Sequence, residues 1–202
     1  MMALVLEQMK KPKDSRALVV APDKSTLMIL RNCGVKSVVT ADVQPERFRW
    51  LDPDVRFIDL ADVDRDSWPS DAFDLIVHSH VIEHIPATMA YPLYELFRMQ
   101  KDTGKQAAII PIMSGSYDED LGEVSVEDRQ RRFGQADHVR RIGRDDLSET
   151  LGKIVKLSPV DFGAEFSEKA LVQANIPREL WTGWNPSTVQ VFSKNDYLLS
   201  LN

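Results

Sequence analysis

The stretch FDLIVHSHVIEHIP, residues 73–86, says more about the fold than any other part of the chain. Its first half, residues 73–77, is a nearly continuous apolar run, which is typical of a strand buried on both faces in a parallel sheet. Its second half gathers titratable side chains at His78, His80, Glu83 and His84. Open α/β sheets bind ligands outside the carboxyl ends of their strands. The stretch therefore predicts an α/β protein with a functional site at the end of this strand.

Strands and helices are predicted to alternate along the rest of the chain. Short apolar runs indicate further strands over residues 16–21, 37–41, 55–58, 107–112, 153–157 and 188–193. Helical segments are expected between them, over residues 1–9, 23–33, 44–51, 89–100 and 145–151. We expect a turn over residues 102–104. This alternation implies an α/β fold with a seven-stranded, mainly parallel sheet and helices on both faces, within one domain over residues 1–202.

The composition favours a folded protein and disfavours polyanionic partners. Of 202 residues, 43% are hydrophobic and 28% are charged, which is enough for one well-filled core. The formal net charge of −6 disfavours partners such as nucleic acid or an anionic membrane. Cys33 is the single cysteine, so no intrachain disulfide is possible. With no secretory signal pattern and no apolar run near the roughly 20 residues of a membrane span, we expect a cytoplasmic protein.

Three aspartates each follow the carboxyl end of a predicted strand, at Asp23, Asp42 and Asp59. In a parallel sheet these ends meet at one edge, which residues 78–80 would share. A single aspartate in such a place is often only a turn or helix-capping residue. Because Asp42 and Asp59 follow successive strands in register, we interpret this edge as a binding site.

Two separated motifs resemble class I S-adenosylmethionine (SAM) dependent methyltransferases. Many of these carry FDLVV in the fourth strand, then a few active-site residues and VLEHIP, as residues 73–86 do here. A bacterial subset carries A-P-E after the first strand and F-G-Q-x-D-H-V-R later; this chain has APD at residues 21–23 and FGQADHVR at residues 133–140. The resemblance covers residues 16–158. It implies a Rossmann-like sheet whose last strand is antiparallel, with SAM as cofactor.

The resemblance also implies roles for the strand-end residues. The acidic residue after the second strand, Asp42, would accept hydrogen bonds from the ribose hydroxyls of the cofactor. A carboxylate suits a diol because it accepts both donors without needing a proton. The acidic residue after the third strand, Asp59, would contact the adenine amine, with the backbone N–H of Leu60 facing the ring.

The first turn departs from the common pattern of these enzymes. Most have a glycine-rich turn there, since the backbone passes close to the amino-acid part of the cofactor. Here Ala21 and Asp23 occupy the turn, and with His78 they are the remaining expected cofactor contacts. Because no glycine lies there, a non-catalytic binding protein with the same fold is the alternative function.

Residues 80–84, HVIEH, admit two metal-binding hypotheses and one structural interpretation. They fit the H-x-x-E-H zinc motif of inverzincin peptidases, in which a helix would present His80 and His84 to zinc and Glu83 would act as base. They also resemble the E-x-x-E-H of ubiquinone O-methyltransferases, with His80 in place of the first glutamate. Pro86 disfavours a long helix. We therefore expect no metal ligand here, and expect Glu83 and His84 to hydrogen-bond backbone groups in a turn.

His80 and His138 are the expected catalytic residues. Methyl transfer from a sulfonium is an in-line displacement, so the protein must align the acceptor and, for a hydroxyl, remove a proton. Histidine titrates near neutral pH and suits this task. His80 follows the fourth strand, and His138 lies in the second motif.

Residues 114–143 form a long, charged segment that we predict to be a lid on the acceptor side of the site. It contains several arginines, and Arg140 is the expected contact to the substrate. Clustered arginines recognise carboxylates and phosphates, which suggests a sugar or another small metabolite with an anionic group. The alternative is that these arginines pair with the acidic residues of the same segment.

Overall fold

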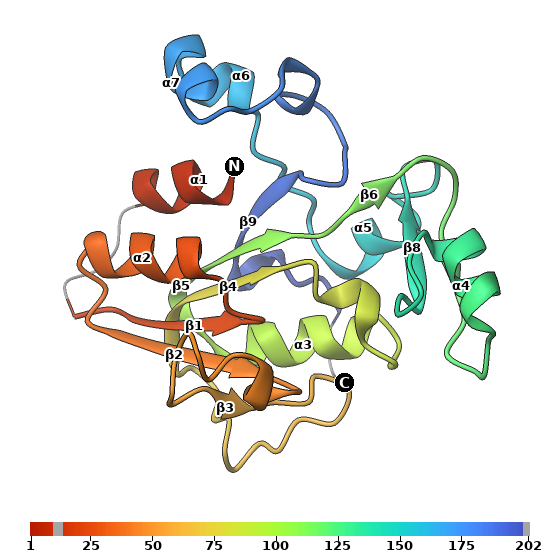
Figure 1. The fold of residues 1–202 in the computed structure, drawn as a ribbon, viewed down its shortest axis with the longest axis horizontal. Helices are drawn as coiled ribbons and strands as arrows, with labels where there is room; N and C mark the ends of the chain where they lie inside the picture. The colour runs from red at the N-terminus through yellow and green to blue at the C-terminus, as the bar shows by residue number, and fades with distance from the viewer. Residues whose placement is uncertain (10–13, 200–202) are drawn as a thin grey trace.

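The predicted strand at the start of residues 73–86 is β4 (Phe73–Ser79), in the middle of a six-stranded sheet. The structure is a computed structural model that describes residues 1–9 and 14–199. The strand order is β3-β2-β1-β4-β5-β9 (Figure 1). The other strands are β1 (Arg16–Val20), β2 (Ser37–Asp42), β3 (Arg56–Phe57), β5 (Gln100–Ile109) and β9 (Val189–Ser193). Neighbours pair in parallel except β9, which is antiparallel to β5 as predicted.

The seventh strand, predicted over residues 153–157, is absent from the described main sheet. Those residues lie partly in the short helix α5 (Leu151–Ile154). Leu151 and Val155 are both fully buried and lie four residues apart, a spacing that places them on one face of a short helix as well as on one face of a strand. Within the predicted range Val155 forms an isolated bridge to Tyr197, and just beyond it Pro159 forms another to Gln190.

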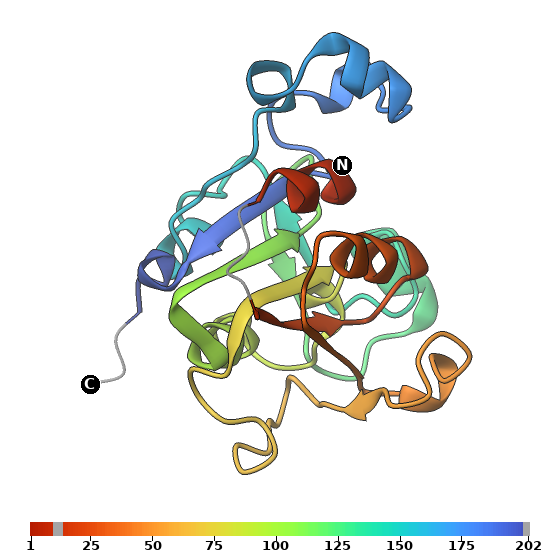
Figure 2. The same ribbon diagram turned by 90° about the vertical axis from the view of Figure 1, so that its left-hand side faces the viewer.

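Helices cover both faces of the sheet. In Figures 1 and 2, α1 and α2 lie over one face and α3 over the other. Besides α5, the α-helices of these layers and of the C-terminal part are α1 (Met2–Gln8), α2 (Lys24–Asn32), α3 (Ala90–Met99), α6 (Phe162–Glu165) and α7 (Glu168–Gln173). Single 3₁₀ turns are η1 (Pro45–Arg47), η2 (Ile82–His84), η3 (Arg178–Leu180) and η4 (Lys194–Asp196). No helix in the described parts of the chain has the length and apolar character needed to cross a bilayer.

The core has two parts because successive residues of the central strands point to opposite faces. Leu18 and Ile76 pack with α3 on one face, whereas Val19 and Val77 pack with α1 and α2 on the other. All four side chains are at most 2% exposed. The central strands are therefore buried on both sides, as the apolar run at residues 73–77 predicts.

The turn predicted over residues 102–104 is instead an irregularity within β5. Phe73 pairs with Gln100, but Leu75 pairs with Lys105, so β5 carries extra residues opposite β4. Gly104 permits this because a Cβ there would lie 2.9 Å from the carbonyl oxygen of Phe73. The extra residues form a bulge, and β5 continues on both sides of it.

Residues 114–143, expected as a loop, fold into regular structure. The segment contains β7 (Asp118–Glu119), α4 (Val126–Phe133) and β8 (Arg140–Gly143). Together with β6 (Ile112–Met113), the strands form a small sheet of order β6-β8-β7. Figure 1 shows β6, β8 and α4 beyond the carboxyl ends of the parallel strands, at the right of the view. The segment is therefore placed to cover the edge at which the site was predicted.

Candidate functional site

Asp42 and Asp59 lie at the same edge of the sheet, as predicted. Strands β2 and β3 run parallel, with Asp42 opposite Phe57, and the backbone N–H of Ile58 donates to the carbonyl of Asp42 over 3.1 Å. Each aspartate binds one nearby backbone N–H with its Oδ1 atom: Asp42 that of Gln44 at 2.7 Å, and Asp59 that of Ala61 at 2.8 Å. In the part of the chain that is described, the Oδ2 atom of each has no hydrogen-bond partner. Both carboxylates are thus fixed in direction with one oxygen free for a ligand.

The first turn adopts, with alanine, the conformation that a glycine would favour. Ala21 has a φ of +52°, and its N–H donates to the carbonyl of Ala41 at the end of β2. Asp23 is the N-cap of α2: Oδ1 accepts the N–H of Thr26 at 3.0 Å, and Oδ2 accepts its hydroxyl at 2.5 Å. The carboxylate of Asp23, expected as a cofactor contact, is therefore engaged in capping α2.

His80 is held in a similarly strained conformation at the end of the adjacent strand. Its φ is +53°, and its N–H donates to the carbonyl of Ile109 over 3.0 Å. Because β1 and β4 are paired in parallel, with Val20 opposite His78, the strained residues Ala21 and His80 lie on neighbouring strand ends. Non-glycine residues with positive φ are uncommon and gather at functional sites. This edge therefore carries the local strain expected of a ligand site.

His78, expected as a cofactor contact, lies inside the protein instead. It is 1% exposed, and its Nε2 lies 3.1 Å from Nε2 of Gln106 on β5. Burial lowers the pKa of His78 to about 4, against a smaller opposing effect of Glu83. Strand alternation explains the difference: His78 belongs to the regular part of β4 and points into the sheet-helix layer, whereas the strand has ended at His80.

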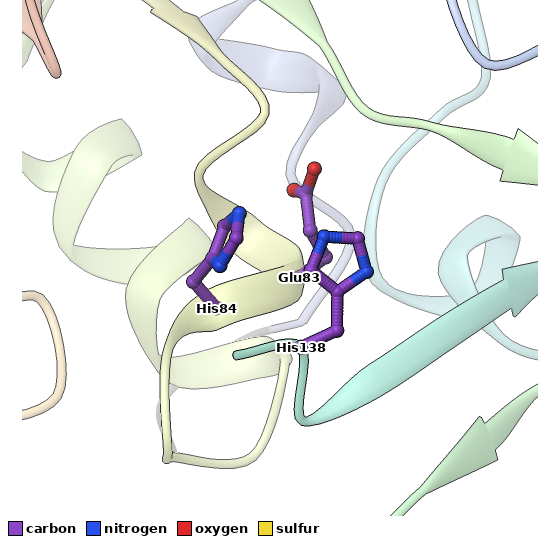
Figure 3. Close-up of side chains that lie close together, drawn as sticks. All are labelled: Glu83, His84 and His138. Carbon is purple, nitrogen blue, oxygen red and sulfur yellow. The ribbon is translucent and has the colours of Figure 1, made fainter. Parts of the chain in front are cut away.

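Beyond the end of β4, three titratable side chains meet from two distant parts of the sequence. Glu83 and His84 lie on η2, and His138 lies on the segment that leads into β8 (Figure 3). The N–H of Val139 donates to the carbonyl of Glu83 over 2.9 Å and joins the two segments. The rings of His84 and His138 meet edge to face, with centroids 4.5 Å apart. The two recognised motifs, far apart in sequence, therefore form one cluster.

Each of these side chains has a fixed orientation. Nδ1 of His80 lies 3.1 Å from Oε1 of Glu83, and Nδ1 of His138 lies 3.1 Å from the carbonyl of Phe133. A carbonyl oxygen only accepts, so Nδ1 of His138 carries the proton. Burial, and then His84, lower the pKa of His138 and favour its neutral form. Glu83 bonds a side chain, not the backbone groups that we expected.

A cavity of about 170 Å³ lies against this cluster. His80, Glu83 and His138 line one part of it, so both expected catalytic histidines face the same space. The remaining lining comes from the chain just after β5, from β6, from residues 114–143 and from Pro186, and includes Pro111, Met113, Phe133, Arg141 and Ile142. The cavity is thus mostly apolar with a few polar groups, which is typical of small-molecule sites.

Arg140, the expected substrate contact, is instead bound on every side by the protein. Its side chain is fully buried; Nε pairs with Glu119, and the two terminal nitrogens donate to the carbonyls of Ile82, Ile85 and Ala87. Arg140 thereby ties the turn that carries Glu83 to β8. The carbonyls of Ile82 and Ile85 also accept the backbone N–H groups of Ile85 and Ala87, so Arg140 binds their second lone pairs and its charge is used for structure.

Arg141 is the cation that sequence analysis missed. It lines the cavity and is half-buried, and its Nε donates to the carbonyl of Ser116 over 3.2 Å. The signal for it was strand alternation, since successive residues of β8 point to different sides. Other arginines of the segment are paired, as the alternative interpretation expected: Arg132 with Asp118 and Asp120, and Arg131 with Asp128.

The helical geometry of the H-x-x-E-H peptidase motif is not formed. His80 precedes η2 with positive φ, and the 3₁₀ turn covers only Ile82–His84. His80 and His84 therefore do not share a helical face, and His80 contacts Glu83 rather than standing beside His84. This removes the arrangement on which the zinc hydrolase hypothesis depends.

Comparison with known proteins places this arrangement in a known fold. The structure is similar to an S-adenosylmethionine dependent methyltransferase from Mesorhizobium loti, with a TM-score of 0.56 and 11% sequence identity. The match covers 94% of this chain and 94% of that chain. The chain has the fold of SAM-dependent methyltransferases. The structure is also similar to a chain from the complex between the Haloferax volcanii Trm112 methyltransferase activator and the putative methyltransferase, with a TM-score of 0.56 and 13% sequence identity. That match covers 93% of this chain and 86% of the other.

A putative methyltransferase from Bacillus halodurans shares the methyltransferase fold as well, with 94% of this chain and 92% of that chain covered, a TM-score of 0.50 and 13% identity. No protein-family model matches the sequence, and no curated protein matches it. At these identities the likeness establishes the fold alone. The functional argument therefore depends on the residues at the carboxyl edge of the sheet.

Proposed function

We propose that the protein transfers a methyl group from SAM to a small-molecule acceptor bound in the cavity beside His80. One observation carries the proposal: this cavity lies at the same edge of a methyltransferase-type sheet as Asp42 and Asp59. Each of these carboxylates has one oxygen available to a ligand. The edge thus offers polar anchors for a nucleoside and, beside them, a separate space for an acceptor.

In this proposal Asp42 binds the ribose and Asp59 the adenine amine. Each carboxylate is directed by a hydrogen bond through Oδ1, which leaves Oδ2 to accept from the cofactor. A carboxylate already oriented by the backbone loses little freedom when the ligand binds. Leu60, next in the chain, supplies the backbone N–H toward the ring.

Ala21 replaces the usual glycine of the first turn. Close approach of the cofactor requires a positive φ and a small side chain, and Ala21 provides both. Asp23 contributes by starting α2, whose first N–H groups lie at the same edge. The glycine-poor turn is thus compatible with SAM, although it also motivates the alternative of a non-catalytic binding protein.

His80 is the proposed base. Its Nδ1 donates to the buried carboxylate of Glu83, so the unprotonated nitrogen is Nε2. A histidine with one nitrogen held by a carboxylate is oriented for proton removal through the other, and the carboxylate stabilises the imidazolium that forms. His80 is about half exposed at the cavity wall, with a side chain 47% exposed. His138 lines the same cavity and is the second proposed catalytic residue.

The acceptor that fits this cavity is small and largely apolar in outline, with a hydroxyl for His80 and an anionic group for Arg141. The apolar lining includes Pro111, Met113 and Ile142, which disfavours a fully polar ligand. Arg141 replaces Arg140 as the proposed substrate contact, because the guanidinium of Arg140 is saturated by Glu119 and backbone carbonyls.

The test is release of S-adenosylhomocysteine from SAM with a panel of hydroxylated carboxylates and phosphorylated sugars. We expect turnover with at least one compound class, and a loss of about 100-fold or more for His80→Gln, the scale of general-base catalysis. Glu127→Gln, an exposed change on α4, is the control and should keep full turnover. SAM binding without turnover of any compound would favour the non-catalytic alternative.

A further inference from the structure

Glu83, His84 and His138 are close enough to hold one metal ion. Each offers one ligand atom, and these three atoms lie within 4.8 Å of one another (Figure 3). The set does not coincide with either hypothesis from residues 80–84, since His138 replaces His80 as the third side chain. It comes from two segments that the Val139 to Glu83 hydrogen bond joins.

The free atoms of the cluster are acceptors, as metal ligands must be. Within residues 1–9 and 14–199, Oε2 of Glu83 and Nε2 of His138 are buried side-chain atoms without a hydrogen-bond partner. Nδ1 of His84 lies 3.3 Å from Oδ2 of Asp137, so its other nitrogen is available. The cluster therefore presents one carboxylate oxygen and two imidazole nitrogens with lone pairs.

A second polar contact fixes the orientation of each of the three side chains. His80 holds the other oxygen of Glu83, Asp137 holds His84, and the carbonyl of Phe133 holds His138. Carboxylates and carbonyls bound to the second nitrogen of a histidine are the usual outer partners of metal-binding histidines, because they fix the ring and its tautomer.

The burial of Glu83 favours a bound cation at this cluster. Glu83 is 1% exposed, and its ionic contact among the described residues is the one to His80. A buried carboxylate with one oxygen unpaired is unfavourable unless a cation or a proton compensates it. A divalent ion beside Glu83, His84 and His138 would satisfy both orphaned atoms at once.

We propose that Glu83, His84 and His138 bind a divalent transition-metal ion of the zinc type. Two imidazoles and one carboxylate are ligands that suit Zn²⁺, and three protein ligands leave a fourth position open. Because Glu83 and His138 line the 170 Å³ cavity, that open position faces a space where a hydroxyl or carboxylate of a bound molecule fits. This site does not depend on the proposed methyl transfer.

The test is metal binding by the full-length protein after removal of metals with a chelator. Calorimetry with Zn²⁺ should give one equivalent, and Co²⁺ should give the intense visible absorption of four-coordinate cobalt. Glu83→Gln and His138→Gln should each weaken Zn²⁺ binding by at least 10-fold, and Asp137→Asn by about 10-fold through His84. Glu127→Gln, an exposed carboxylate of the same segment, should have no effect.

A variant that keeps the ligand number guards against misfolding. His84 is partly exposed, with 31% of its side chain accessible, so His84→Cys should fold and add a thiolate-to-cobalt charge-transfer band to the Co²⁺ spectrum. The proposal is overturned if the wild type binds no stoichiometric Zn²⁺ or Co²⁺. It is equally overturned if binding persists unchanged in Glu83→Gln and His138→Gln, or if His84→Cys folds and binds cobalt without that band.

Discussion

The two halves of the site are built by different kinds of contact. At the proposed cofactor half, Asp23, Asp42 and Asp59 each bond a backbone N–H two or three residues ahead. At the acceptor half, the η2 turn is held by Arg140 and Val139, more than 50 residues away in the chain. The cofactor half is held by hydrogen bonds between residues that are close in sequence. The acceptor half forms only when residues 114–143 have folded over the edge of the sheet. The cofactor half should therefore tolerate single changes better than the acceptor half.

The largest expected effect is on the acceptor half, with Arg140→Met. The change leaves Glu119 and the carbonyls of the η2 turn without their buried partner, which should cost about 3–5 kcal/mol of unfolding free energy. Urea unfolding followed by circular dichroism measures it. Arg141→Met, half-buried on the same strand, is the control and should cost under about 1 kcal/mol. Equal losses in both variants would mean that the long-range ties of Arg140 do not hold this half together.

Lowering the pH should reduce the unfolding free energy of the protein through the buried side chain of His78. Its folded pKa of about 4 lies below the ordinary 6.5, so His78 contributes stability that is complete above pH 6.5 and is lost as pH falls toward 4. The shift corresponds to about 3 kcal/mol between these limits, with Glu83 as the nearby opposing charge. Unfolding free energies measured from pH 7 to 4 should show this loss in the wild type. They should show a shallower pH dependence in His78→Gln, and identical slopes would contradict the assignment.

A smaller effect is expected in the cofactor half for Asp23→Ala. Loss of the N-cap of α2 should lower stability by about 1 kcal/mol. Thermal unfolding compares it with Ser25→Ala, an exposed change in the same turn that should be nearly neutral. If Asp23→Ala weakens SAM binding strongly while stability stays unchanged, Asp23 is a ligand contact and its capping role is minor.

The smallest effect concerns Ala21→Gly. Relief of the positive φ is favourable by about 1–2 kcal/mol, and the added freedom of glycine in the unfolded chain offsets about 0.5–1 kcal/mol. The variant should therefore be as stable as the wild type or more stable by up to about 1.5 kcal/mol. Ala17→Gly, in the regular part of β1, is the matched control and should lose stability. A clear loss in Ala21→Gly would show that the turn is not strained.

The contrast between the halves also explains what could be predicted from the sequence. The cofactor half depends on strand ends, which apolar runs and following aspartates mark directly, so the shared edge of Asp42 and Asp59 was foreseen. The inward placement of His78 was missed because the exact end of a strand is not encoded in the apolar run. At Arg140 the sequence indicated a charge but not its partners, since these carbonyls come from residues 82–87.

The spacing of apolar residues misled the prediction at the far edge of the sheet. The buried Leu151 and Val155 fit both a strand and a short helix, and the helix formed in part. The partnership of Glu83 with His138 joins two motifs that were recognised separately. Their pairing is a tertiary contact, so no local pattern could assign it.

The central claim, that this edge binds SAM, is tested most directly by calorimetry with SAM and S-adenosylhomocysteine. The account predicts saturable one-to-one binding of both ligands. In Asp42→Ala the binding free energy should fall by about 1–3 kcal/mol, the scale of a lost buried hydrogen-bond partner, with the fold intact. Absence of heat and of any thermal shift at millimolar ligand, or equal affinity in the wild type and Asp42→Ala, would contradict it.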